Sequence, residues 1–397
     1  SQEGTLSVVG YYAAGSLQKN TIIDEDGSVA ETFTDNSGRV LLSVNVQESG
    51  RLETYSVYDD RGLLRYVLSP EASSQLGTSV NEIVLQRLAY RYDYDSWGRL
   101  IKKRLPGCEP VYMVYDKRDR LVMSQDGNQR NQNSGKWSYA LYDDQNRVIE
   151  TGEVMVTASH SSLQKAASAS DNYIPSLTRD ALQYTVYDAY TLVGGQNPLA
   201  FRATSGYSSD YCRQVVGLVT SVRTRVLGTN TWLTTTTYYD ERSRVIQAVS
   251  DNYLGYKSYV DFKYDFVGNV VKMREAHGNS STAFDVVETT NDYDDRGRLL
   301  STNTVLNGGI PAVVTCSYDA VGRLVNKKYG NVTESLIYNV RGWLTSKESV
   351  PFSTTVEVLG LLIAFELLQE SGIHLPQAIG QSVSIIGGIV VGTAAVE

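Results

Sequence analysis

The segment Tyr293-Asp294-Asp295-Arg296-Gly297-Arg298-Leu299-Leu300 contains a pattern that recurs through most of the chain before residue 346. Where no longer excursion intervenes, successive copies begin 20 to 29 residues apart (Tyr318 to Tyr338 is 20, Tyr264 to Tyr293 is 29), a period typical of an array built from one small supersecondary unit. The other copies begin at Tyr58, Tyr94, Tyr115, Tyr142, Tyr239, Tyr264, Tyr318 and Tyr338.

The repeated pattern predicts a β-hairpin turn. We expect the Asp at the first position of a type I turn, where its carboxylate accepts backbone N–H groups two and three residues on. The Gly three residues after the Asp would supply a positive φ, with Tyr ending one strand and Leu or Val starting the next. Asp119 and Asn146 stand at the Gly position in two copies and tolerate the left-handed region, whereas Ser243 is a weaker substitute.

Structural turn roles are predicted for three residues in each of five copies. These residues are Tyr58, Asp59, Gly62, Tyr94, Asp95, Gly98, Tyr264, Asp265, Gly268, Tyr293, Asp294, Gly297, Tyr318, Asp319 and Gly322. The Arg that follows the Gly in many copies is expected to pair with a neighbouring carboxylate.

The Y-D-x-x-G-R-L pattern resembles the YD repeat of the rearrangement-hotspot (Rhs) proteins, over roughly residues 23–346. Residues 64–74 and 106–127 resemble the subset of that family found in large surface or secreted proteins of gut-type bacteria. The resemblance implies a β-sheet strip that spirals into a hollow shell, which in toxin systems encloses a C-terminal effector. It also implies a secreted or cell-surface location for residues 1–346, with an effector or the rest of the shell as partner. Composition and spacing alone indicate only a hairpin array.

Three segments are expected along the chain: degenerate repeats over 1–57, regular hairpin repeats over 58–346 with an insertion near 152–182, and an apolar helical tail over 347–397. Residues 69–79 are expected to form a polar loop, and residues 161–169 a short helical turn before Pro175. The Asp24–Gly27 segment is close to a calcium loop, but Ile22 stands at the first ligand position. We therefore expect a plain turn there, and no metal site.

Composition limits the function. The net charge of −8 and the absence of a Lys/Arg cluster disfavour nucleic-acid binding. The 28 Tyr against 7 Phe indicate aromatic positions that keep one end in contact with water. Cys108, Cys212 and Cys316 are too sparse for a disulfide framework or a metal cluster, so we expect small buried or half-buried thiols, with a single bridge as the alternative.

The tail has a different composition from the repeats. Thr354 and Glu357 form a capping box, and residues 356–370 predict an apolar helix that ends at Gly372. The 22 residues from 375 to 396 carry no charge and could span a bilayer, or form a packed or re-entrant segment. Glu366 and Glu370, one helical turn apart, are the functional candidates of the tail, either as intramembrane carboxylates or at the membrane interface.

The tail carries a separate resemblance. Residues 350–352, 364–376 and 379–388 resemble the membrane domain of the spore germinant-receptor A subunit, which implies membrane association through about 356–396. Gln369-Glu370 stands where that family has Arg-Glu, and His374 where it has Arg. Two unrelated patterns that meet near Ser346 suggest a fusion, natural or from assembly of a gene sequence.

No catalytic constellation is present in the sequence. The motifs Gly-x-Ser-x-Gly, His-Glu-x-x-His and Cys-x-x-Cys and the P-loop are missing, and His160, His277 and His374 are expected to be structural. The repeated Asp could suggest a glycosidase carboxylate pair, but recurrence at one turn position favours a role in the fold. We therefore expect no enzyme and no cofactor.

The sequence favours a non-enzymatic shell or surface scaffold of a secreted Rhs-type, polymorphic-toxin-like protein. The first alternative is a membrane component of a germinant receptor, from the tail alone. The second is a carbohydrate-binding module whose Tyr rows and Trp residues stack on glycans rather than pack within the sheet. The Trp residues in question are Trp97, Trp137, Trp232 and Trp343.

Overall fold

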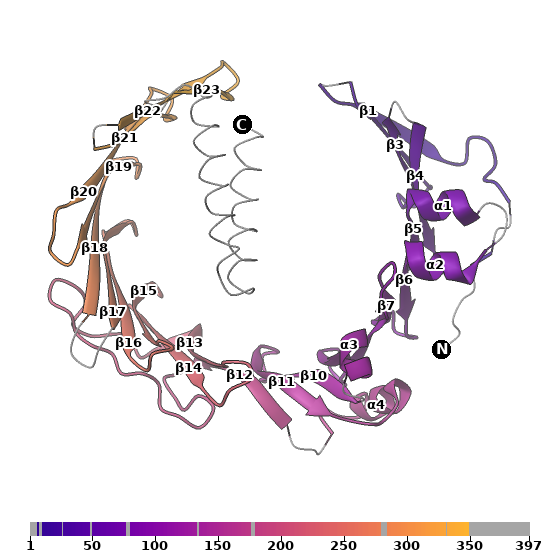
Figure 1. Cartoon of the computed structure of the whole chain (residues 1–397), viewed down its shortest axis with the longest axis horizontal. Helices are drawn as coiled ribbons and strands as arrows, with labels where there is room; N and C mark the ends of the chain where they lie inside the picture. The colour runs from indigo at the N-terminus through magenta and orange to yellow at the C-terminus, as the bar shows by residue number, and fades with distance from the viewer. Residues whose placement is uncertain are drawn as a thin grey trace, which may run out of the picture. The chain divides into compact units, whose positions relative to one another are not determined.

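The computed structural model describes residues 6–348 apart from 8–9, 26, 48–49, 77–79, 133–134, 176–178, 279–283 and 331 (Figure 1). This described part is mainly antiparallel β-sheet built from successive hairpins, which confirms the predicted fold class. The chain divides into two compact units, residues 1–198 with 213–235 and residues 199–212 with 236–397. The division falls inside the segment 58–346 that the sequence presents as one array.

In the first unit, each strand pairs with the next strand along the chain. Its strands are β1 (Gln18–Ile23), β2 (Val29–Thr34), β3 (Val40–Gln47), β4 (Gly50–Tyr58), β5 (Leu64–Leu68), β6 (Ala89–Tyr94), β7 (Leu100–Arg104), β8 (Val111–Tyr115), β9 (Leu121–Gln125), β10 (Lys136–Tyr142), β11 (Val148–Met155), β12 (Arg179–Asp188) and β13 (Val215–Arg225). The border between the units falls within β14 (Trp232–Tyr239).

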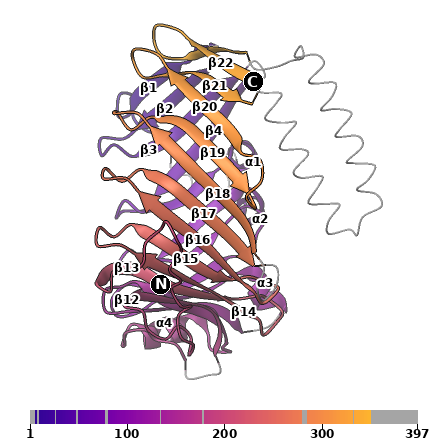
Figure 2. The same ribbon diagram turned by 90° about the vertical axis from the view of Figure 1, so that its left-hand side faces the viewer.

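The second unit repeats the same order of pairing from strand to strand, as Figure 2 shows for its long strands. Its strands are β15 (Val245–Asp251), β16 (Lys257–Tyr264), β17 (Val270–Gly278), β18 (Phe284–Tyr293), β19 (Leu299–Leu306), β20 (Ala312–Tyr318), β21 (Leu324–Tyr329), β22 (Val332–Tyr338) and β23 (Leu344–Glu348).

The register at each repeated turn is the same. Tyr293, the last residue of β18, pairs with Leu299, the first of β19, and the register shifts by one residue just before Tyr293. Tyr318 pairs with Leu324 in the same way. A type I turn followed by one residue at positive φ produces this bulge, which increases the local twist.

Four short helices interrupt the strands of the first unit within its described residues: α1 (Pro70–Leu76), α2 (Glu82–Leu88), α3 (Gly127–Gln132) and α4 (His160–Ala167). α4 overlaps most of the helical turn expected over 161–169 and begins one residue earlier, at His160. The polar loop expected over 69–79 is wrong, because α1 occupies most of it. Ser69 accepts a hydrogen bond from the Ala72 amide (3.2 Å) at the N-terminus of α1, and Pro70 takes the first helical position, where its missing N–H has no consequence.

These helices supply the apolar cores of the first unit. Ala72 and Leu76 of α1 and Leu85 of α2 pack with Tyr66 and Leu68 of β5. A second core forms where α4 covers β8 to β11, and it includes Leu163, Ala167, Val114, Val122, Met123, Trp137, Tyr139, Val154 and Val156. The insertion near 152–182 thus buries a face of the sheet that the hairpins alone leave open.

In the second unit, the 199–212 segment lies against strands β14 to β16. The Arg202 amide donates to the Gln247 side chain (2.9 Å), which donates back to the Arg202 carbonyl (2.7 Å). Thr204 donates to Asp261 (3.1 Å), a carboxylate only 1% exposed. This stretch, which contains no helix or strand, therefore takes part in a buried polar network.

No helix within the described residues is long and apolar enough to cross a membrane. The predicted tail helix over 356–370 and the uncharged stretch 375–396 lie outside the described residues.

Candidate functional site

The repeated turn is held by one carboxylate. The Asp294 side chain accepts hydrogen bonds from the amides of Arg296 and Arg298 (both 2.9 Å), two and four residues on. The expectation of two and three residues on is therefore wrong for this turn, because the N–H of Gly297 donates to the Asp294 carbonyl instead (2.9 Å). Asp59, Asp95 and Asp319 accept the same pair of amides, whereas Asp265 accepts from residues three and four on.

The turn requires a left-handed residue three positions after the Asp. The five predicted glycines, Gly62, Gly98, Gly268, Gly297 and Gly322, have φ values of 80°, 83°, 105°, 75° and 93°. Asp119, Asn146 and Ser243 adopt φ of 61°, 65° and 61° at the same position. Substitution of the Gly has thus left the backbone shape unchanged.

The repeated Arg links one hairpin to the next. Arg298 pairs with the carboxylate of its own turn, Asp294, at 2.6 Å, and its guanidinium lies 4.7 Å from the ring centroid of Tyr318 in the following hairpin. The expected pairing with a carboxylate is present, and the stacking on the next Tyr is additional. The same arrangement, with guanidinium-to-ring distances of 4.3 to 5.4 Å, joins Arg39 to Tyr58, Arg99 to Tyr115, Arg120 to Tyr142, Arg147 to Tyr187, Arg244 to Tyr264 and Arg323 to Tyr338.

The Tyr hydroxyl adds a contact back to the preceding hairpin. Tyr318 donates to the Leu299 carbonyl (2.9 Å), Tyr293 to the Val270 carbonyl (3.1 Å) and Tyr264 to the Val245 carbonyl (2.8 Å). We call the turn Asp, its Arg and the Tyr of the next hairpin the hairpin clamp. The abundance of Tyr over Phe is explained in these repeats, since the ring stacks on Arg while the hydroxyl makes a hydrogen bond.

Two predicted positions depart from the clamp. Leu63 replaces the Arg in the Tyr58 copy, and Arg61 instead donates to the Asp95 carbonyl of the next turn (3.1 Å). In the Tyr264 copy Asn269 takes the place of the Arg and donates to Asp265 (2.8 Å). Each copy still has a side-chain hydrogen bond, from Arg61 in one and Asn269 in the other, but neither Leu63 nor Asn269 can stack a guanidinium on the next Tyr.

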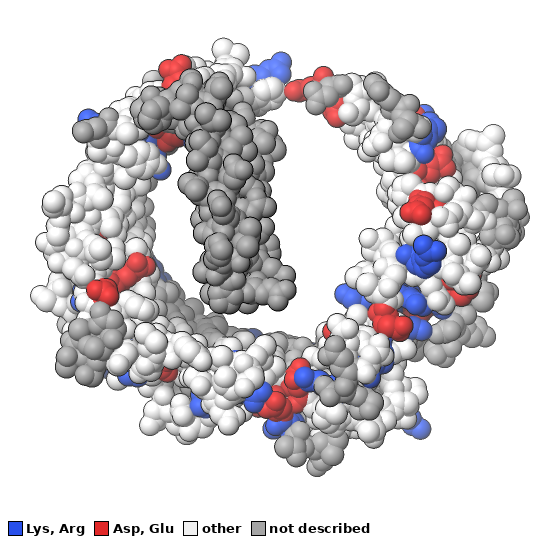
Figure 3. Space-filling model, viewed as in Figure 1, with Lys and Arg blue, Asp and Glu red and all other residues white. Residues whose placement is uncertain are grey.

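Electrostatics support the clamp. Burial alone would raise the pKa of Asp116, but hydrogen bonds from the Arg120 side chain and amide hold the pKa below its ordinary value. The side-chain hydrogen bond from Arg147, with the Gly217 amide, lowers the pKa of Asp188 to about 2. On the face drawn in Figure 3, Lys and Arg side chains are interspersed with Asp and Glu rather than gathered in one patch.

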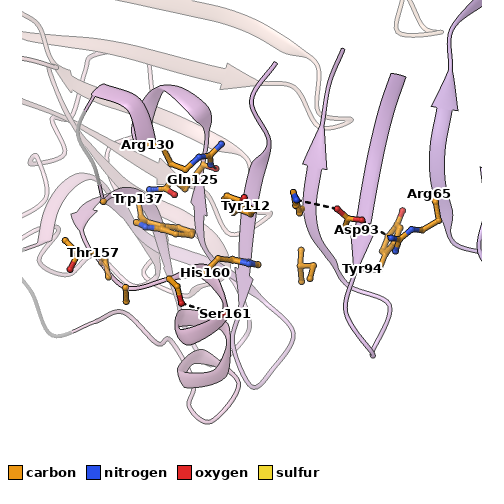
Figure 4. Close-up of a pocket in the computed structure, with 16 residues that line it drawn as sticks. Arg65, Asp93, Tyr94, Tyr112, Gln125, Arg130, Trp137, Thr157, His160 and Ser161 are labelled. Atoms are coloured by element: carbon orange, nitrogen blue, oxygen red, sulfur yellow. Dashed lines mark hydrogen bonds and ion pairs between the residues drawn. The ribbon is translucent and has the colours of Figure 1, made fainter. Parts of the chain in front are cut away.

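A second feature of the first unit is a groove of about 650 Å³ (Figure 4). Asp93, Lys102, Tyr112 and Gln125 line it from consecutive strands of the sheet, and α3 and the residues leading into α4 complete it. Sequence reasoning did not find this site, because its residues come from the repeat strands and from two insertions that no motif connects. We call it the α3–α4 groove.

An aromatic cluster forms one wall of the α3–α4 groove. The His160 ring lies 5.0 Å from Tyr112 and 6.4 Å from Trp137, stacked on both, and its Nε2 bonds the Met113 carbonyl (2.8 Å). Burial lowers the pKa of His160, which favours the neutral form of the ring. The Arg130 guanidinium covers Tyr112 at 4.6 Å.

The four tryptophans considered as stacking platforms for glycans lie in the core or beside aromatic and arginine side chains. Trp137 is 2% exposed in the core, and Trp232 stacks on Tyr184 with Arg223 at 4.7 Å. Trp97 and Trp343 are 66% and 53% exposed, and each has an arginine beside its ring, Arg99 at 4.4 Å and Arg341 at 5.4 Å. These contacts favour packing over a row of open aromatic faces.

The remaining candidates are scattered. His277 is exposed and bonds Ser258 (2.9 Å), while His374, Glu366 and Glu370 lie outside the described residues. None of the three cysteines forms a disulfide: Cys212 and Cys316 are half-buried as expected, and the expectation of burial is wrong for Cys108, which is exposed. Cys108 lies in a turn between β7 and β8.

Comparison with known proteins identifies a family similarity at the C-terminus. The family model described as Bacillus/Clostridium GerA spore germination protein matches residues 338–397. The chain is 34% identical over 116 residues to the spore germination protein GerLA of Bacillus cereus (28% of this chain, 22% of that protein). It is 51% identical over 53 residues to the uncharacterized membrane protein YfkQ of Bacillus subtilis (strain 168) (13% of this chain, 10% of that protein). The chain thus spans less than a quarter of the length of either relative.

Among solved structures, the Tc holotoxin pore of Photorhabdus luminescens aligns over 81% of this chain and 16% of that chain, with 13% identity and a TM-score of 0.37. The segment 338–397 is similar to the GerA family by its own sequence match, in agreement with the resemblance found in the sequence analysis.

Proposed function

We propose that the described part of this chain is a non-enzymatic structural segment, a shell or surface scaffold of a secreted Rhs-type protein. The observation that carries the proposal is the hairpin clamp. Its charged and aromatic residues, the groups that catalysis would need, are engaged in joining one hairpin to the next in both units. A strip made of one repeated joint is suited to enclosing or displaying another protein.

The proposal predicts protection of a cargo. A small protease-sensitive reporter fused after residue 397 of the full chain would be digested several-fold more slowly than the free reporter, because a shell hinders access of the protease. A fusion carrying Arg244→Ala, Arg298→Ala and Arg323→Ala provides the control, since it loosens the clamps of the second unit. Equal digestion of the fused and free reporters would argue against an enclosing shell.

The GerA match favours a second function for residues 338–397. We propose that this segment is a membrane component of the spore germination type, with Glu366 and Glu370 as its intramembrane carboxylates. Membrane fractionation should place the full chain in a carbonate-resistant pellet and a chain ending at residue 348 in the supernatant. The same distribution for both chains would contradict the proposal.

We also infer that two unrelated segments join near Ser346, as a natural fusion or in gene assembly. The repeated hairpins run to β23, which ends at Glu348, and the GerA match begins at residue 338, so the two patterns meet within residues 338–348. A single long read of genomic DNA across codons 340–355 tests it, and an uninterrupted reading frame in that read would establish a natural fusion.

A further inference from the structure

We propose that the α3–α4 groove binds an acidic saccharide, a sugar chain that carries carboxylate groups. This inference goes beyond the scaffold role, since it assigns a ligand to one face of the first unit. Figure 4 shows the lining residues, with Arg130, Tyr112, Trp137 and His160 on one side and Asp93, Arg65 and Tyr94 on the other. A volume of about 650 Å³ lies within the range of small-ligand sites.

The charge of the groove favours an anion. Arg65, Lys102 and Arg130 line it against the single carboxylate of Asp93, in a chain whose net charge is −8. Arg130 donates to two backbone carbonyls, those of Gln125 and Pro110, so these contacts leave its positive charge without a carboxylate. Positive groups on low-dielectric walls concentrate anions in a cleft.

Asp93 favours an anion that also carries hydroxyl groups over a simple anion such as phosphate. Its side chain is only about 10% exposed and pairs with Arg65 at 2.8 Å, but its Oδ2 accepts no hydrogen bond from any described residue. Arg91 Nε and Lys102 Nζ lie 3.5 Å and 3.9 Å from Oδ2, at ion-pair distance but beyond good hydrogen-bond distance. A buried acceptor left open in this way suits a hydroxyl donor from a ligand. A ligand that supplies both a carboxylate and hydroxyl groups therefore fits better than phosphate.

The aromatic residues contribute a wall rather than a stacking platform. His160 stacks on Tyr112 and Trp137, and Arg130 lies on Tyr112, so these ring faces already have partners. The exposed side chains of Thr157, Ser159 and Ser161 at the rim provide hydroxyl groups that can bond to sugar hydroxyls. Recognition would therefore depend on polar contacts and on salt concentration.

Calorimetric titration of the full chain with trigalacturonate tests the proposal, with maltotriose as the neutral probe and hexaglutamate as the acidic peptide probe. We expect binding of trigalacturonate and a dissociation constant at least about tenfold weaker for both other probes. Arg130→Gln should weaken trigalacturonate binding about tenfold, whereas Arg296→Gln, at an exposed turn of the second unit, should leave it unchanged. Ser161→Trp, a substitution on the exposed rim, should block the groove without loss of the folded state, which circular dichroism would verify.

Three results would overturn the proposal. They are no heat of binding with trigalacturonate, equal affinity for maltotriose or hexaglutamate, and unchanged affinity in a folded Ser161→Trp variant.

Discussion

At the scale of single residues, burial decides how much a hairpin clamp contributes to the free energy of unfolding. The Asp116 side chain is fully buried and that of Arg120 is 7% exposed, whereas the side chain of the equivalent Arg298 is 27% exposed. Arg120 places three hydrogen bonds on Asp116, two from its guanidinium and one from its amide. The same sequence motif therefore has different energetic weight in different copies.

Arg120→Leu should lower the free energy of unfolding of the first unit by about 3 kcal/mol, because it leaves a buried carboxylate without its charge partner. Arg298→Leu, at the solvent-exposed copy, should have a clearly smaller effect. Urea unfolding followed by tryptophan fluorescence and circular dichroism would measure both. Similar losses for the two variants would show that burial does not control the strength of the clamp.

The turn position with positive φ allows two substitutions whose effects on stability should have opposite signs. Gly297→Ala should destabilise the second unit by about 1 kcal/mol, since an L side chain at φ 75° is strained although its Cβ would make only ordinary contact with the Asn269 side chain, at 3.8 Å. Ser243→Gly should stabilise the same unit by a similar or smaller amount, because φ is 61° there. Thermal unfolding measures both, and a shift of both variants in the same direction would contradict this account.

At the scale of elements, the hairpins were predictable and the helices between them were not. The Asp and Gly of each turn act within a few residues of each other, so the sequence pattern alone predicts the hairpin. α1 was missed although Ser69 and Pro70 are typical helix-start residues, because its polar composition suggested a loop. The hairpin at Asn252 was missed too, since Asn replaces Asp there while Gly255 keeps the positive φ. The α3–α4 groove was beyond reach because its lining residues meet only after the sheet has folded.

The contact between neighbouring hairpins can be measured in a double-mutant cycle. Arg244→Met and Tyr264→Leu should show a coupling free energy of about 0.5 to 1 kcal/mol, because the guanidinium lies 4.6 Å from the ring centroid. Tyr264→Phe alone should cost about 1 kcal/mol through loss of the bond to the Val245 carbonyl. Arg244 with Tyr318, which are not neighbours, serves as the control cycle and should give no coupling. A coupling free energy equal to that of the control cycle would show that the clamp does not link neighbouring hairpins.

At the scale of the whole molecule, one short motif is repeated, and the small stabilising effects of its copies add up. Each clamp fixes a turn and attaches the next hairpin, so each unit is built from contacts between neighbours along the chain. The insertions follow a different principle, since they cover the sheet and create the cores and the groove. The sequence therefore predicts the repeated architecture well and the local functional surfaces poorly.

The repeated carboxylates predict a common response to acid. The folded-state pKa is lowered in most of these turns, for example through the backbone amide and side chain of Arg298 at Asp294. It is also lowered, to about 2, at Asp188 at the end of β12, whose carboxylate accepts hydrogen bonds from Arg147. A carboxyl group whose folded pKa lies below its unfolded value stabilises the fold above the unfolded pKa, near 3.8, and loses that contribution as pH falls through the folded pKa. The unfolding temperature should therefore change little between pH 7 and pH 5 and fall steeply from about pH 4 toward pH 2.

Asp188→Asn isolates one part of this response. Because the amide does not ionise, the variant should be less stable than the parent at pH 7, and the difference should shrink between pH 4 and pH 2 as the parent carboxylate takes up its proton. Differential scanning calorimetry at a series of pH values measures both curves, with Asp60→Asn, at an exposed neighbour of a turn Asp, as the control. A constant difference between parent and Asp188→Asn across the acid range would mean that Asp188 acts through its shape and hydrogen bonds and not through its charge.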